Sequence, residues 1–460
     1  MTGAEAGHTE TRHTETGNAE TGNAEAGHTE PSIASLPPLR RNVAFQLLWT
    51  GTSAATLGVS VADIAYPLVI LAVTRSPALA GLFAATQGLG MLLAGLPAGV
   101  LADRYDSRVI VIVTETVRAA VTAAVVTALV AGWVPVPLLF AAAALLGAGQ
   151  AIRGPAALLL TRSVVPPEQL ARALTQDEVR VNGAALAGPA LGGALYALRA
   201  LGHAVPFLVT AGSFVIAVIT TALTKAPAGD GPPQDSASED GTSEGGRAGR
   251  GSMLAGVRAL WDQPVLRAAT LLIMVVNTIG AGLDLVVIVI LRHQAVRPGL
   301  IGLALGAGAA GGLAGAPLVR TLHRLRPGLL LLAVCALDGV ILALLAVPAA
   351  PWWVAGLLFT AMLGVPAVRV LIDILVIRQA PPGQRGRVIA ALMTLIGLGA
   401  PAGVAGCGFL LQYLPAQAAM LALAAAELLV VAFCSARREF WQARWPGVTA
   451  PGAGPATVRR

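Results

Sequence analysis

Long apolar segments alternate with short polar ones along most of this chain, from residue 42 onward. A helix that crosses a bilayer needs about 20 mostly apolar residues, and these segments have that length. The pattern therefore predicts membrane-spanning helices. We expect twelve, in two sets of six, at residues 45–73, 77–101, 108–131, 135–161, 174–198, 203–224, 264–291, 298–319, 327–348, 352–377, 387–412 and 415–436.

Three polar segments interrupt or flank this pattern. Residues 1–41 contain a repeat of five residues ("GHTET RHTET GNAET GNAEA GHTEP"), a period that matches neither helix nor strand, so we expect a disordered tail. Residues 225–255 are rich in Gly, Ser, Pro and acidic residues, which is typical of a flexible linker. Residues 437–460 form a second tail. The two helical bundles then cover residues 42–224 and 256–436.

The composition supports a membrane protein. The chain is 55% hydrophobic and 12% charged, whereas a soluble domain carries roughly 25% charged residues. Small residues dominate and aromatic residues are few, which suits closely packed membrane helices better than barrel strands. We therefore expect an all-α fold of two pseudo-symmetric six-helix bundles. Cys335, Cys407 and Cys434 lie in apolar runs and are expected to be buried and unpaired.

The chain lacks complete motifs for nucleotide binding and catalysis. The sole lysine, Lys225, lies outside any P-loop pattern, so we expect no ATP hydrolysis. Ser243 stands in a Gly-x-Ser-x-Gly match within the linker, which offers no strand-to-helix elbow and no histidine partner. No cluster with metal-ligand spacing is found. We expect no enzyme activity, no cofactor or metal and no nucleic-acid partner.

Arginine and lysine gather in alternate loops, and this bias sets the orientation of membrane helices. The richer loops and the C-terminal tail contain Arg104, Arg108, Arg162, Arg172, Lys225, Arg247, Arg250, Arg258, Arg320, Arg324, Arg326, Arg378, Arg385, Arg387, Arg437, Arg438 and Arg444, while the opposite loops contain Arg75, Arg199, Arg292 and Arg297. We therefore expect both termini and the linker in the cytoplasm. Residues 1–39 contain no apolar core, so a cleavable signal peptide is not expected.

The two halves of the chain resemble each other. "SPALAGL" (76–82) and "RPGLIGL" (297–303) align at an offset of 221 residues, and the same offset brings Asp63 onto Asp284. Internal duplication around a flexible middle is typical of transporters that bind substrate between two bundles.

The loop after the second predicted helix has a specific motif. "GVLADRYDSR" (99–108) resembles the Gly-x-Leu-Ala-Asp-Arg-x-Gly-Arg-Arg/Lys motif of the major facilitator superfamily, through Gly99, Leu101, Ala102, Asp103, Arg104 and Arg108. Asp106 departs from that pattern but is similar to the exporter branch that includes enterobactin and macrolide efflux proteins. The resemblance implies that Asp103 meets the N-terminus of helix 11 as a cytoplasmic latch, with Gly99 allowing a close approach of backbones.

Two further motifs extend the resemblance over about residues 42–436. Gly188, Pro189, Gly192 and Gly193 are similar to the antiporter motif of helix 5, and Arg153 loosely fits the arginine motif of helix 4. The family resemblance implies a secondary transporter that works by alternating access, with helices 1 and 7 lining a central cavity. We expect a monomer in the inner (plasma) membrane of a bacterium.

Acidic residues inside the predicted helices are candidates for proton coupling or substrate binding. Asp63 precedes Arg75 by 12 residues and so lies about 18 Å deep at 1.5 Å per residue. An acid at the bilayer centre costs about 2.5–3.5 kcal/mol and usually faces a cavity or a partner. Asp63 and Asp284 are therefore expected to bind a proton or a cation; the alternative is a structural pair with an arginine.

Other charges are spaced for pairing within one helix. Glu115 and Arg118 are three residues apart, and Arg369 and Asp373 are four apart. Each pair is expected to neutralise itself, with a coupling role as the alternative. For Arg153 the candidate partners are Asp177 and Glu178, and for Asp338 and Glu427 no partner is identified.

Together these features predict a proton-coupled exporter of a small amphipathic compound such as a drug or an antibiotic. An apolar cavity with few polar groups suits such molecules better than sugars. Export of a siderophore or another metabolite is the main alternative. A receptor or scaffold without transport would be expected to lose the membrane acids and the loop motif, and this chain keeps both.

Overall fold

The protein is built from helices in every part that the structure describes. The computed structural model describes residues 39–198, 200–224, 258, 261, 264–322, 326–379 and 385–436, and these ranges contain no strand. The all-α prediction is confirmed. The tail expected at 1–41 lies outside the described residues up to residue 38, as do the whole of the linker at 225–255 and the whole of the tail at 437–460.

Six long helices form the N-terminal half, and several have the start signals that their sequences contain. Asn42 caps the first helix, where its Oδ1 accepts a hydrogen bond from the Phe45 N–H at 3.0 Å. Ser76 caps the second in the same way. The helices are α1 (Val43–Thr74), α2 (Pro77–Arg104), α3 (Ser107–Val130), α4 (Val136–Val164), α5 (Pro167–Ala197) and α6 (Val205–Leu223), with short 3₁₀ turns at Leu39–Arg41 and Ala200–His203.

The C-terminal half repeats this plan with two interruptions. The tenth predicted segment, 352–377, consists of two consecutive helices that meet at Gly364, where a side chain would collide with Val334. The eighth ends in a 3₁₀ turn at Ala316–Leu318. The elements are α8 (Pro264–His293), α9 (Pro298–Gly315), α10 (Val319–Leu322), α11 (Pro327–Leu345), α12 (Pro351–Leu363), α13 (Val365–Gln379), α14 (Arg385–Tyr413) and α15 (Ala416–Ser435).

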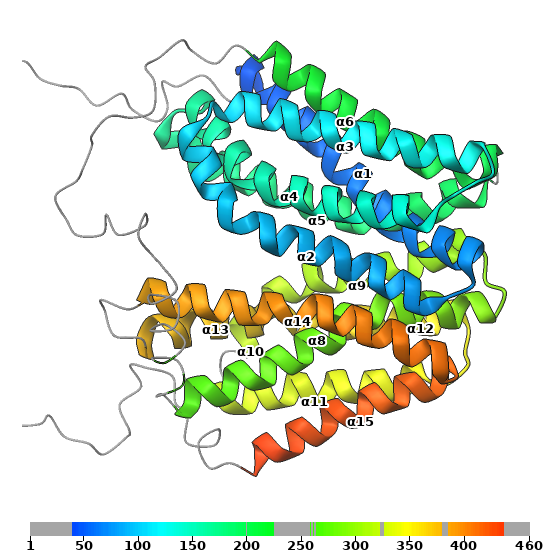
Figure 1. Cartoon of the computed structure of the whole chain (residues 1–460). Coiled ribbons are helices and arrows are strands. Elements are labelled where there is room, and N and C mark those ends of the chain that lie inside the picture. Colours follow the sequence, from blue (N-terminus) through cyan, green and yellow to red (C-terminus); the bar gives the residue numbers. More distant parts are fainter. Residues whose placement is uncertain are drawn as a thin grey trace, which may run out of the picture. The chain divides into compact units, whose positions relative to one another are not determined.

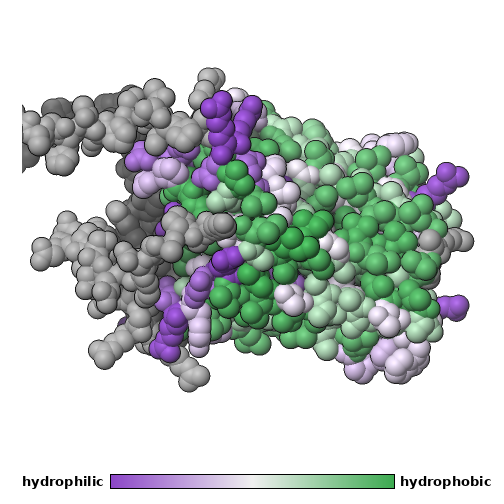
Figure 2. All heavy atoms as spheres, turned by 90° about the horizontal axis from the view of Figure 1, so that it is seen from above, coloured by the Kyte–Doolittle hydropathy of each residue, from purple (hydrophilic) through white to green (hydrophobic). Residues whose placement is uncertain are grey.

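The described surface is that of a membrane protein. Eleven of the spans found in the described residues are long and apolar enough to cross a bilayer. Helix α5 also has the length, with 31 residues, but is not among these spans. Large apolar side chains such as Leu93, Ile219 and Leu429 are more than half exposed. Figure 2 shows a broad hydrophobic band on one face of the molecule, with hydrophilic residues toward the two ends. Lipid is the solvent that such a band requires.

Two helix pairs join the halves. Helix α2 packs against α14, and α5 packs against α9 (Figure 1). Both pairs approach closely through small residues: an added Cβ at Gly81 would lie 2.6 Å from the Val404 carbonyl oxygen, and one at Gly302 would overlap the carbonyl of Pro189. Small residues allow membrane helices to approach to backbone contact, so the α2–α14 and α5–α9 interfaces are closely packed.

Candidate functional site

A central cavity of about 550 Å³ lies between the two halves. Most of its lining is apolar and comes from α1, α2, α5, α8, α9, α12 and α14. Its polar side chains are few, and the described lining contains no basic residue. These polar side chains are Ser60, Asp63, Tyr66, Gln87 and Asp284.

The two predicted membrane acids meet in this cavity. Asp63 of α1 and Asp284 of α8 both line it, and both side chains are exposed to it although their neighbours on the helix are buried. The two carboxylates repel each other, and Asp63 also interacts with the Gln87 side chain. The offset of 221 residues therefore brought two equivalent positions to one place. Gln87 is a cavity residue that sequence reasoning missed, because an amide in an apolar helix has no distinctive spacing.

One end of the cavity is closed by contacts between the halves. The Ser76 hydroxyl donates a hydrogen bond to Gln412 Oε1 at 2.9 Å, and Arg292 Nη1 donates one to the Leu68 carbonyl at 3.0 Å. The helix-5 motif adds to this closure, because a side chain at Gly193 would overlap the Pro298 carbonyl of α9. These contacts lie at the end that bears the Arg-poor loops.

The rest of the helix-5 motif packs within its own half. A side chain at Gly188 would overlap Ser60, and one at Gly192 would approach the Val61 carbonyl to 2.6 Å. Glycine is therefore required where α5 crosses α1. The Pro189 carbonyl lies on the other side of α5, against Gly302 of α9.

At the opposite end the predicted latch stays a prediction, because the side chains at the start of α14 lie outside the described residues. Asp103 and Arg104 are exposed at the end of α2, and neither forms an ion pair with a described residue. An added Cβ at Gly99 would meet no atom of the described residues within 4 Å. The described contacts of α2 with α14 lie near Gly81 and Gly88, toward the other end of α2.

Two charges of the same loop have local roles. Asp106 caps α3, with its Oδ1 accepting a hydrogen bond from the Arg108 N–H at 2.7 Å. Arg108 Nε donates to the Thr221 carbonyl at 3.3 Å, and its Nη2 contacts the Ala222 carbonyl. Arg108 therefore binds the carbonyl end of α6, where a cation is favoured by the helix dipole.

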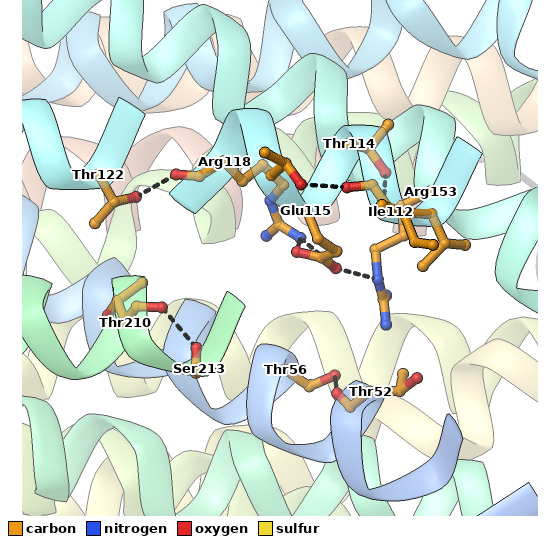
Figure 3. A network of polar contacts seen from close by, with 12 residues as sticks. Thr52, Thr56, Ile112, Thr114, Glu115, Arg118, Thr122, Arg153, Thr210 and Ser213 are labelled. Atoms are coloured by element: carbon orange, nitrogen blue, oxygen red, sulfur yellow. Dashed lines mark hydrogen bonds and ion pairs between the residues drawn. The ribbon is translucent and has the colours of Figure 1, made fainter. Parts of the chain in front are cut away.

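A buried charge network lies inside the N-terminal bundle (Figure 3). Glu115 of α3 is fully buried and binds two guanidinium groups: Arg118 Nη1 at 3.2 Å and Arg153 Nε of α4 at 2.5 Å. The Arg118 guanidinium also stacks over the Phe214 ring at 4.2 Å and attracts Asp63. The predicted Glu115–Arg118 pair is confirmed, and the network reaches from the cavity acid to α4.

Arg153 has a different partner from those that the sequence suggested. Asp177 pairs instead with Arg180, with Asp177 Oδ1 3.6 Å from Arg180 Nη2. Arg153 binds Glu115 because α3 packs directly against α4. The pattern along a single helix could not show this pairing across helices.

The remaining predicted charges lie in the C-terminal half. Arg369 is exposed on α13, and the Asp373 side chain lies outside the described residues, so their predicted pair stays a prediction. Asp338 of α11 and Glu427 of α15 interact with each other. All three cysteines are buried, as expected.

Comparisons with known proteins agree with this architecture. Residues 48–404 match the family model of the Major Facilitator Superfamily. The chain is 27% identical over 283 residues to the multidrug efflux pump Tap of Mycobacterium tuberculosis and of Mycobacterium bovis. That match covers 60% of this chain and 64% of the relatives, so it spans less than two thirds of their length.

Solved structures share the fold at lower identity. A bacterial homologue of the human lysosomal transporter Spinster, in an inward-facing and unoccupied conformation, superposes with a TM-score of 0.65 at 18% identity, covering 90% of this chain and all of that one. An inward-facing bacterial homologue of the iron transporter ferroportin gives 0.64 at 18% identity, covering 87% and 100%. The family model matches most of the chain, and the two-bundle fold with its central cavity is as that family requires: this multi-pass membrane protein belongs to the major facilitator superfamily.

Proposed function

We propose that this transporter is a proton-coupled exporter of small amphipathic compounds, with a preference for cationic ones. The observation that carries the proposal is the pair of carboxylates, Asp63 and Asp284, in a cavity with a mostly apolar lining. A volume of about 550 Å³ falls within the range of about 300–1,000 Å³ typical of pockets for drug-sized ligands. The similarity to the Tap efflux pumps supports export of drug-like molecules.

The direction of opening follows from the topology that the loop charges predict. The closed end bears the Arg-poor loops, which that topology places outside the cell. The cavity then opens to the cytoplasm, with both termini on the same side, and takes substrate from the cell interior. Closure of the cytoplasmic end would bring Asp103 toward the N-terminus of α14, where the positive end of the helix dipole favours a carboxylate.

Protons supply the driving force in this proposal. Two carboxylates in one cavity repel each other, so binding a cationic substrate and binding a proton are competing ways to relieve that repulsion. Each proton that enters down a potential of 100 mV releases about 2.3 kcal/mol. Proton binding on the outside would thus displace the substrate and reset the transporter.

The test is substrate flux in liposomes that contain the purified chain, with and without an imposed pH gradient. Asp63→Asn fixes the neutral form, so we expect gradient-driven export to fall to background while counterflow exchange survives. Asp284→Asn is the matched variant in the other half, and Asp338→Asn is the control, since Asp338 does not line the cavity. If Asp63→Asn exports at the wild-type rate under a gradient, Asp63 is structural and Asp284 becomes the candidate.

The substrate class is tested in the same liposomes. A cationic amphipathic dye, a neutral amphipathic compound and a ferric siderophore are supplied in turn. Export of the siderophore alone would replace the drug assignment with the metabolite alternative. No flux of any compound from a wide panel would favour a receptor or scaffold.

A further inference from the structure

A second cavity lies within the N-terminal bundle, between α1, α4 and α5. Its volume is about 280 Å³, and it shares no lining residue with the central cavity. More than half of its lining residues are polar or charged, unlike the mainly apolar lining of the central site. These polar residues are Trp49, Thr52, Thr56, Gln150, Arg153, Thr161, Asp177 and Arg180.

Buried hydrogen-bond donors in this lining lack an acceptor. Arg180 Nε and Nη1 and the Trp49 indole Nε1 are all buried, and none has a hydrogen-bond partner among the described residues. The Arg180 side chain is 10% exposed. Its contact with Asp177, at 3.6 Å through Nη2, is an ion pair too long to be a hydrogen bond. A buried donor without an acceptor costs about 1–3 kcal/mol, and more when it is charged.

The hydrogen-bond donors of the cavity suit an anion. Its lining contains two guanidinium groups, Arg153 and Arg180, and one carboxylate, Asp177. Glu115 pairs with Arg153 and Glu178 also interacts with Arg180, so the unsatisfied donors of Arg180, and not an excess of charge, carry the argument. A guanidinium presents its donors in a plane that matches the oxygens of a phosphate group.

We propose that this cavity binds a phosphate group, with Arg180 as its main ligand and the Trp49 indole N–H as a second donor. Asp177 stays beside Arg180 and limits the affinity through repulsion. Arg153 links the cavity to Glu115, Arg118 and Asp63, so an anion bound here lies at one end of the charge network that reaches the transport site. The phosphate can come from free phosphate esters or from the head group of an anionic lipid.

Binding is measured on the purified full chain with inorganic phosphate, by isothermal titration at constant ionic strength against chloride. We expect saturable binding that Arg180→Gln weakens at least tenfold. Arg172→Gln is the matched control, because Arg172 is an exposed arginine on the same helix. Trp49→Phe keeps the ring and removes the N–H, and we expect it to weaken binding severalfold; it serves as the test if Arg180→Gln does not fold.

A lipid arm identifies the source of the phosphate. The chain is placed in nanodiscs that contain phosphatidic acid or only phosphatidylcholine, and retained lipid is counted by native mass spectrometry. Retention of phosphatidic acid that depends on Arg180 assigns a lipid head group, and binding of inorganic phosphate alone assigns a soluble ester. The proposal is overturned if neither probe binds saturably, or if Arg180→Gln and Arg172→Gln bind equally.

Discussion

Replacing Glu115 by glutamine removes the carboxylate that two buried guanidiniums share. Glu115 is 0% exposed, and Arg118 and Arg153 are 2% and 8% exposed, so water cannot take over its role. Removing one partner of a buried ion pair costs about 3–5 kcal/mol, because the remaining charge is left uncompensated. Arg153→Gln is the informative comparison, since it leaves Glu115 and Arg118 as a neutral pair. We therefore expect Glu115→Gln to be much the more damaging of the two.

The expected loss is large enough to measure by heating. In a domain of 150–250 residues, 1 kcal/mol shifts the melting temperature by roughly 2–4 °C, so Glu115→Gln should lower the apparent value by about 6–20 °C. The assay heats detergent-purified protein and quantifies the monodisperse fraction by size-exclusion chromatography. Glu115→Gln with Arg153→Gln should recover part of the loss, because Arg118 then keeps Asp63 as its counter-charge.

Two results would refute this reasoning. A melting temperature for Glu115→Gln within about 2 °C of the wild type would mean that the carboxylate does not compensate the charge of the two arginines. A double variant no more stable than Glu115→Gln alone would mean that the unpaired cations are not the source of the loss.

Three further outcomes are expected. Asp103→Asn should insert normally but lower transport at least severalfold, and a wild-type rate in liposomes would exclude the latch. Gly302→Leu should hold the closed end apart, because the new side chain collides with the Pro189 carbonyl; a cysteine placed at Ser76 should then react faster with a membrane-impermeant thiol reagent than in the Gly302 parent. Deleting residues 1–39 should leave export nearly unchanged, and complete loss in a stably expressed truncation would point to a regulatory tail.

Features that depend on a single helix were predictable from the sequence. The apolar lengths located every long helix, and the three-residue spacing identified the Glu115–Arg118 pair, because both signals repeat along one chain segment. The internal repeat went further and placed Asp63 and Asp284 in equivalent positions. The family resemblance then implied that helices 1 and 7 line the central cavity, and Asp63 and Asp284 both line it.

Features that depend on packing between helices were not predictable. Arg153 binds Glu115 because α3 and α4 are neighbours, and no periodicity within α4 reveals this. The same limit applies to Asp338 and Glu427, which come together only because α11 packs against α15. The latch predicted from the loop motif is of the same kind: it depends on a contact between α2 and the start of α14, whose side chains lie outside the described residues, so it stays a prediction.

The two halves have the same helix packing but different side chains at equivalent interfaces. Helices α3 and α6 of the first half pack together as α11 and α15 do in the second. In the first half Arg118 fills that interface, stacked over Phe214 and bound to Glu115. The offset of 221 residues brings Gly339 to the position of Arg118, and there the helices close directly, so that an added Cβ would lie 2.8 Å from the Leu428 side chain.

This asymmetry bears on how a proton could control the transporter. Asp63 is linked through Arg118 to a chain of buried charges, so a change in its ionisation alters the electrostatic balance throughout the N-terminal bundle. Among the described residues, Asp284 forms no ion pair, and its half contains a pair of acids in place of an ion-pair network. A coupling free energy requires a group whose charge is felt by other groups. In the proposed mechanism the N-terminal bundle would provide that group and its partners, whereas Asp284 would contribute to the cavity a charge that substrate or proton neutralises.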